Sequence, residues 1–287
     1  MELGLHVPNF TWANGPAALG ADLATLARTA DQAGFGYLSV MDHFFQIPSV
    51  GPAEHEMLEA YTTLGFLAAH TERVKLLTLV TGVIYRHPGV LAKAITTLDV
   101  LSGGRAVFGV GAGWNEEESR ALGFEFPSTK ERFELLEENL RYVRQMWDEG
   151  DAPFTGKHFE AQRLLNVPQP LTRPRPPILI GGGGEKKTLR FVAQYGDACN
   201  LGDSPELEHK LTVLKQHCED VGRDYAEITK TVARVLDLTA KPADLLGHLE
   251  RLHGLGIDAV FGVLTGEPDL AALERLGSDV IPAAGKF

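Results

Sequence analysis

The chain has 287 residues, with 27 Lys and Arg against 38 Asp and Glu, so its formal net charge at neutral pH is −11. This acidity argues against nucleic acid as a partner, because nucleic-acid binding depends on basic side chains that neutralise phosphates. Only two cysteines are present, the N-terminus has no signal-peptide pattern, and no apolar run reaches the length of a membrane span, so we expect a cytoplasmic protein with no disulfide scaffold and no membrane partner.

Short apolar runs alternate with longer amphipathic stretches along the chain. The short runs are rich in Val, Ile and Leu, which is typical of parallel strands buried on both faces. They predict strands at Leu3–Val7, Tyr37–Met41, Lys75–Val80, Ala106–Val110, Ile178–Ile180, Ala198–Leu201, Ile228–Leu236 and Ala259–Leu264. Apolar residues three and four apart predict helices at Leu19–Ala33, Leu91–Leu101, Phe133–Trp147, Thr188–Tyr195, Leu207–Val221, Leu245–Leu255 and Leu270–Leu276.

Repeated strand-then-helix units leave two topologies, an open doubly wound sheet or a closed barrel. Eight units in a chain of this length favour the (β/α)8 barrel, an α/β fold. No linker or change in composition divides the chain, so we expect a single domain over residues 1–287. The segment Asp151–Pro177 carries six prolines and predicts an insertion before the fifth strand, with a hairpin around Phe154–Phe159.

The residues that follow each strand are the candidate site, because barrel enzymes carry their chemistry at the carboxyl ends of the strands. Gly181–Gly184 lies between the fifth strand and a helix, where backbone N–H groups can approach an anion. Lys186, Lys187 and Arg190 follow it, and their charge suits a phosphate. The alternative is a merely tight turn, which needs fewer glycines.

A second glycine pattern, Gly109-x-Gly111-x-Gly113, follows the fourth strand. Its spacing is not that of dinucleotide-binding folds. The glycines suit the close approach of a flat ring to the backbone, although taken alone strand flexibility explains them better.

Asp42 and His43 follow the second strand and form the pair of residue types that proton transfer needs. Adjacent strand residues point in opposite directions, so Asp42 need not orient His43. His248 and His253 have a finger-like separation, but no Cys pair precedes them and on one helix they would point to different faces, so no metal is expected. A Schiff-base aldolase is disfavoured, because Lys75 and Lys230 lie towards the wrong ends of their strands.

Several longer motifs resemble the luciferase-like monooxygenase superfamily and, within it, the oxidoreductases that use the deazaflavin coenzyme F-420. The likeness covers most of the chain up to about Asp203. Its most specific part is Leu98-Asp99-Val100-Leu101-Ser102-Gly103-Gly104-Arg105, followed by Gly109-Val110-Gly111-Ala112-Gly113-Trp114-Asn115-Glu116-Glu117-Glu118. Supporting motifs are Met41-Asp42-His43-Phe44, Thr71-Glu72-Arg73-Val74-Lys75-Leu76 and Arg86-His87-Pro88.

This resemblance implies a (β/α)8 barrel with its cofactor in the mouth and His43 as the acid/base residue. It implies cofactor contacts from strand-end and loop residues, namely Asp42, Thr81, Gly82, Val83, Ala112, Gly113, Asn115, Gly182, Gly183, Gly184, Glu185 and Lys186. The last five of these would hold the phosphate. A non-prolyl cis peptide of the family would map to Gly82-Val83. Family habit also implies a homodimer.

The resemblance has one departure that bears on the substrate. The sugar-phosphate dehydrogenases of this branch carry a proton-donating Glu directly after the fourth-strand glycines, where this chain has Trp114. We therefore expect a bulkier, less polar pocket for a small organic substrate, formed by Phe10, Phe44, Phe45 and Trp114, with Trp12 as a further candidate.

The expected function is hydride transfer between coenzyme F-420 and that small substrate. The alternatives are an FMN-dependent luciferase-like monooxygenase, a flavin-binding barrel without turnover and, third, a phosphate-handling barrel isomerase or aldolase.

Overall fold

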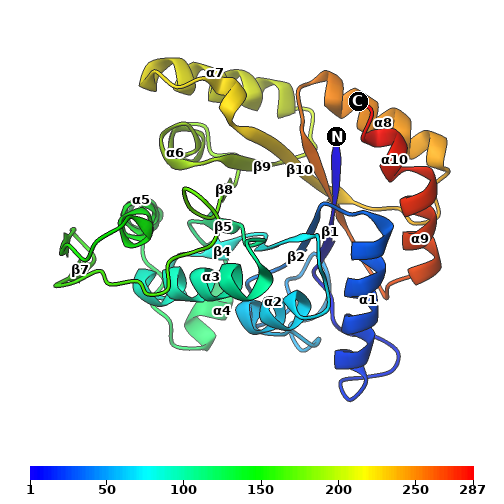
Figure 1. Cartoon of the computed structure of the whole chain (residues 1–287), viewed down its shortest axis with the longest axis horizontal. Helices are drawn as coiled ribbons and strands as arrows, with labels where there is room; N and C mark the ends of the chain where they lie inside the picture. Colours follow the sequence, from blue (N-terminus) through cyan, green and yellow to red (C-terminus); the bar gives the residue numbers. More distant parts are fainter.

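Eight parallel strands form a nearly closed barrel in the computed structural model, which describes residues 1–287 (Figure 1). The barrel strands are β1 (Glu2–Val7), β2 (Tyr37–Val40), β3 (Lys75–Thr78), β5 (Phe108–Gly111), β8 (Ile178–Gly181), β9 (Ala198–Gly202), β10 (Thr229–Val235) and β11 (Ala259–Val263). They pair in the order β3-β2-β1-β11-β10-β9-β8-β5. A single parallel bridge between Leu76 and Ala106 joins the two ends. The predicted (β/α)8 barrel is confirmed.

Three short strands complete the sheets. The two-residue β4 (Thr81–Gly82) follows β3 and extends the edge of β5. The antiparallel pair β6 (Phe154–Thr155) and β7 (Glu160–Ala161) forms the predicted hairpin in the segment that precedes β8, and this pair projects from the barrel at the left of Figure 1.

Helices surround the strands (Figure 1). They are α1 (Leu19–Ala33), α2 (Ala60–Ala68), α3 (Pro88–Ser102), α4 (Glu116–Ala121), α5 (Thr129–Trp147), α6 (Thr188–Tyr195), α7 (Leu207–Val221), α8 (Pro242–Gly254), α9 (Leu270–Asp279) and α10 (Ile281–Ala284), with a 3-10 turn at Tyr225–Glu227. Local signals set several ends: Gly34 ends α1 in a left-handed conformation, and Ser128 and Glu131 form a capping box that opens α5. Every helix is too short or too polar to cross a bilayer.

Side chains on the strands alternate between two apolar layers. Leu3, Leu5 and Val7 of β1 pack outward into the core between the strands and the helices. A second cluster fills the interior of the barrel and includes Tyr37, Val107 and Phe261. A Cβ on Gly4 would come within 2.8 Å of the Phe261 ring, so β1 leaves room for that ring. The interior of the barrel is therefore packed, and a cavity opens at the carboxyl ends of the strands.

Candidate active site

A cavity of about 580 Å³ opens at the carboxyl ends of the barrel strands. This size is typical of pockets for cofactors and small molecules. Its lining consists of His6, Pro8, Met41, Asp42, His43, Ile47, Ser49, Val50, Leu79, Val80, Gly111, Ala112, Gly113, Trp114, Phe133, Gly181, Gly182, Gly183, Gly184, Thr188, Asn200, Ala233 and Val263. The chain thus brings together Asp42 and His43 with the glycines that follow the fourth and fifth barrel strands.

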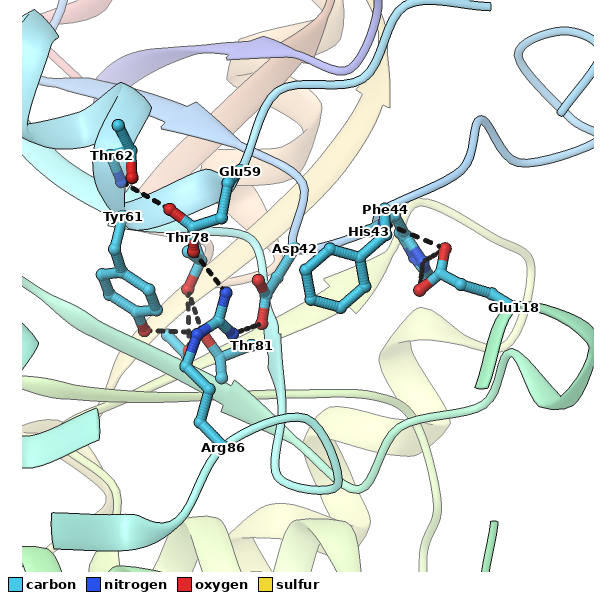
Figure 2. A network of polar contacts seen from close by, with 11 residues as sticks. Asp42, His43, Phe44, Glu59, Tyr61, Thr62, Thr78, Thr81, Arg86 and Glu118 are labelled. Carbon is cyan, nitrogen blue, oxygen red and sulfur yellow. Dashed lines mark hydrogen bonds and ion pairs between the residues drawn. The ribbon is translucent and has the colours of Figure 1, made fainter. Parts of the chain in front are cut away.

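His43 pairs with a buried carboxylate that the sequence did not identify. Glu118, fully buried in α4, accepts a hydrogen bond from His43 Nδ1 at 3.2 Å through Oε2 (Figure 2). The same oxygen accepts from the backbone N–H groups of Phe44 and Phe45, each at 3.1 Å. Burial raises the pKa of Glu118, but the hydrogen bonds from His43 and Phe45 outweigh it and hold the pKa below its ordinary value. Because an ionised carboxylate only accepts, His43 donates through Nδ1, and its Nε2 is free to take or give a proton.

Asp42 belongs to a separate network around Arg86. Arg86 Nη1 lies 2.7 Å from Asp42 Oδ2, and Nη2 lies 2.5 Å from Oε1 of Glu59 (Figure 2). The Arg86 guanidinium also lies 5.0 Å from the centre of the Tyr61 ring. Burial raises the pKa of Asp42, and Arg86 offsets only part of that rise. The prediction that Asp42 need not orient His43 is confirmed, since each side chain has its own partner.

The turn after β3 differs from the sequence expectation. β3 ends at Thr78, and the non-prolyl cis peptide joins Leu79 and Val80, so its expected position at Gly82-Val83 is wrong. The physical reason is that the strand ends two residues earlier than its apolar run. Leu79 and Val80 line the cavity, whereas Thr81, Gly82 and Val83 do not.

Thr81 instead takes part in a buried chain of hydroxyl groups. Its Oγ1 lies 2.6 Å from the Tyr61 hydroxyl and 2.7 Å from Thr78 Oγ1, which donates to the carbonyl of Gly109 at 3.1 Å. Gly82 pairs with Gly111 in the short strand β4. Thr81 and Gly82 therefore lie outside the cavity and contact the strands that form its wall.

The glycines in and just after β5 are needed for two different reasons. A Cβ on Gly109 would come within 1.9 Å of the Thr78 carbonyl oxygen, and one on Gly111 within 3.0 Å of the Val80 side chain. These two glycines therefore allow close packing of the chain on itself. Gly113 has φ +78° and lines the cavity beside Ala112. Asn115, just outside, caps α4 by accepting from the Glu118 N–H.

The loop after β8 leaves backbone donors unused. Gly182 has φ +117° and donates to the Asn200 carbonyl, but the N–H groups of Gly183 and Gly184 have no acceptor within the protein. They precede the N-terminus of α6, where an anion is favoured. Glu185 pairs with Lys210 at 2.6 Å. Glu185 and Lys186 adjoin the loop and do not line the cavity.

Of the four aromatic pocket candidates, only Trp114 lines the main cavity. Its side chain is 58% exposed and meets the His43 ring edge-on at 5.3 Å. Phe10 packs in the core beside Trp12, and Phe44 packs against Tyr85 and Phe124. Phe45 lines a neighbouring cavity, which shares Trp114 as a wall. Phe10, Phe44 and Phe45 were expected in the pocket wall and do not line this cavity, because their side chains turn into the core or towards the adjacent cavity.

Two residues on the floor of the cavity were missed as well. His6 Nδ1 lies 2.9 Å from Ser39 Oγ, and burial lowers the pKa of His6 to about 4. Asn200 donates to Thr231 Oγ1 at 2.9 Å. Strand alternation could have found His6, because it lies out of phase with Leu5 and Val7, which face outward.

These residues fit a flat cofactor that carries a phosphate. The cavity is walled by glycines where a larger side chain would intrude, and the unpaired N–H groups of Gly183 and Gly184 suit a phosphate at the rim. His43 supplies a group that can exchange a proton in the same space.

Comparison with known proteins agrees with a cavity for a flat, phosphorylated cofactor. The sequence model of the luciferase-like monooxygenase family matches residues 1–272. An F420-dependent glucose-6-phosphate dehydrogenase from Kineococcus radiotolerans is 32% identical over 229 residues, which are 78% of this chain and 66% of that enzyme. An uncharacterized protein from Mycobacterium tuberculosis is 29% identical over 273 residues, 89% of this chain and 92% of its own length.

Solved structures share the fold at lower identity. An F420-dependent secondary alcohol dehydrogenase in complex with an F420-acetone adduct has a TM-score of 0.84 at 17% identity, covering 99% of this chain and 98% of that one. A coenzyme F420-dependent tetrahydromethanopterin reductase from Methanopyrus kandleri has a TM-score of 0.81 at 18% identity, covering 98% of each chain. At such identities the likeness concerns the fold alone.

Proposed function

The chain belongs to the luciferase-like monooxygenase family, and we propose that it is an oxidoreductase that uses coenzyme F-420 to transfer a hydride to or from a small organic substrate. The observation that carries this proposal is one cavity that joins a glycine-rich anion loop to a histidine held by a buried carboxylate. The sequence likeness to F420-dependent dehydrogenases supports this choice of cofactor.

The chain's own residues bind and orient the cofactor in this proposal. The N–H groups of Gly183 and Gly184 would hold the phosphate, and the backbone of Ala112 and Gly113 would lie against the ring system. Asp42, fixed by Arg86, would hold the polar side of that ring. A bound deazaflavin supplies a two-electron hydride acceptor or donor.

The proton is handled by His43. Glu118 fixes the donor at Nδ1, so Nε2 can take the proton of a substrate hydroxyl as the hydride leaves the neighbouring carbon. The alcohol becomes a carbonyl compound. In the reverse direction the carbonyl carbon receives the hydride and the carbonyl oxygen receives the proton. Trp114 packs edge-on against His43 and shields the pair from water on one side.

Parallel titration of the purified protein with coenzyme F-420 and with FMN tests the proposal. We expect saturable 1:1 binding of coenzyme F-420 and its reduction by an alcohol, seen as loss of deazaflavin absorbance. Retention of FMN alone, with no binding of coenzyme F-420, would contradict it and favour the FMN-dependent alternative.

A further inference from the structure

The wall of the cavity contains no lysine or arginine, although it contains the carboxylate of Asp42. Arg86, which contacts Asp42, is held on both sides by Asp42 and Glu59. Lys210, near the glycine loop, pairs with Glu185 and Glu206. An anionic group on the substrate would therefore be desolvated without a countercharge, which is costly.

The anion-binding feature at the rim is the pair of free N–H groups on Gly183 and Gly184. The proposed function assigns these groups to the phosphate of the cofactor. The rest of the lining offers mainly apolar surface, from Pro8, Ile47, Val50, Ala233 and Val263. This composition suits an uncharged substrate.

His6 gives the floor of the cavity a hydrogen-bond acceptor. Ser39 Oγ donates to the Leu5 carbonyl at 3.4 Å, so it accepts from His6 Nδ1 at 2.9 Å. The other ring nitrogen, Nε2, is then an acceptor, and no protein group donates to it. Because burial lowers the pKa of His6 to about 4, the ring stays neutral near pH 7.

Asn200 adds a second acceptor on the same floor. Thr231 Oγ1 donates to the Cys199 carbonyl at 2.8 Å, so it accepts from Asn200 Nδ2. The Asn200 side-chain oxygen is left without a protein donor. The floor thus offers two acceptors, and the complementary ligand group is a neutral donor, such as a hydroxyl.

Resting on the proposed function, we propose that the substrate is an uncharged alcohol, or the matching ketone, that carries a second hydroxyl, and that His6 accepts a hydrogen bond from this second group. His6 is then a specificity-determining residue, while His43 acts on the reacting hydroxyl. This substrate class differs from the phosphorylated sugar named for the curated dehydrogenases.

Three ring compounds on one carbon skeleton test this proposal: cyclohexane-1,3-diol, cyclohexanol and 3-hydroxycyclohexanecarboxylate. With coenzyme F-420 bound, we expect kcat/KM for the diol to exceed that for cyclohexanol about tenfold, and the carboxylate to react at least about a hundredfold more slowly than the diol. In His6→Leu the diol preference should vanish, and in His6→Gln, which keeps an acceptor, most of it should remain. His253→Leu, an exposed histidine on α8, is the matched control.

Binding to the cofactor-free protein gives a second readout, because Trp114 lines the cavity while Trp12 and Trp147 are buried in the core. The diol should change the Trp fluorescence at lower concentration than cyclohexanol does, and His6→Leu should remove that difference. Faster turnover or tighter binding of the carboxylate would overturn the uncharged class. The role of His6 would be overturned if folded His6→Leu kept the preference for the diol. It would also be overturned if that variant lost affinity for coenzyme F-420 while the preference stayed unchanged.

Failure of the proposed function has its own signature. If the protein does not bind coenzyme F-420, the proposed hydride transfer to that cofactor is refuted. The fluorescence titrations still decide whether the cavity prefers an uncharged diol.

Discussion

Replacing Glu118 by Gln tests the histidine–carboxylate pair with little change in shape. The single oxygen Oε2 accepts from His43, Phe44 and Phe45, so the amide oxygen of Gln can occupy the same place and keep neutral versions of these bonds. What the substitution removes is the negative charge behind His43. A hydrogen bond to a charged group contributes about 1.5–3 kcal/mol, against about 0.5–1.5 kcal/mol for a neutral one.

Since about 1.4 kcal/mol corresponds to a tenfold change in rate, a difference of about 1–1.5 kcal/mol predicts a loss in kcat of roughly 5- to 13-fold. KM should change little, because Glu118 does not line the cavity. The assay follows deazaflavin absorbance at saturating coenzyme F-420 with the best alcohol substrate. Glu117→Gln, on the exposed side of the same helix, is the matched control and should retain full activity.

A folded Glu118→Gln variant with the kcat of the wild type would refute this reasoning. It would show that His43 needs no charged partner. Thermal unfolding of both variants, measured in parallel, separates a catalytic loss from a loss of structure.

Three further predictions concern stability. Gly109→Ala should destabilise the fold by about 1–3 kcal/mol in urea unfolding, because its Cβ would collide with the Thr78 carbonyl. Gly20→Ala on helix α1, which has open space around it, is the control and should be neutral or slightly stabilising. Equal effects of the two substitutions would contradict the packing argument. Arg86→Met should cost about 3–5 kcal/mol, since it leaves a buried carboxylate without its countercharge, and a loss below about 1 kcal/mol in the same assay would contradict the pairing. His6 has a pKa lowered from 6.5 to about 4, so below pH 6.5 the unfolded chain binds more protons than the folded chain, and the free energy of unfolding decreases as the pH decreases. Between pH 7.5 and 5 the loss of stability from this residue should be about 2 kcal/mol. The loss should be absent in His6→Gln, and an unchanged pH dependence in that variant would contradict the assignment.

The barrel could be predicted because its strands are short apolar runs separated by amphipathic helices. Asp42 and His43 could be found for the same reason, since the end of a buried strand marks the mouth of a barrel. The end of β3 could not be found this way. The apolar run continues through Leu79 and Val80, although the strand stops at Thr78, and nothing local marks the change.

Helix α2 was not predicted, and its composition gives the reason. Thr62, Thr63 and Gly65 have low helix propensity. Leu64 and Leu67 are buried on the same helix, so packing outweighs local preference.

The partners of the site residues were out of reach for a different reason. Glu118 lies 75 residues after His43, and Arg86 lies 44 residues after Asp42. Both pairs exist only because the barrel closes, and the charged start of α4 gave no sign of which glutamate would be buried. Strand ends can therefore be identified locally, while the groups that tune them depend on tertiary contacts.

The structure of the protein crystallised with coenzyme F-420 tests the central claim most directly. We predict the deazaflavin in the cavity between Gly113 and the Gly182–Gly184 loop, with its phosphate at the N–H groups of that loop and His43 facing the ring. Deazaflavin bound at another place, with the cavity closed by side chains, would contradict the account.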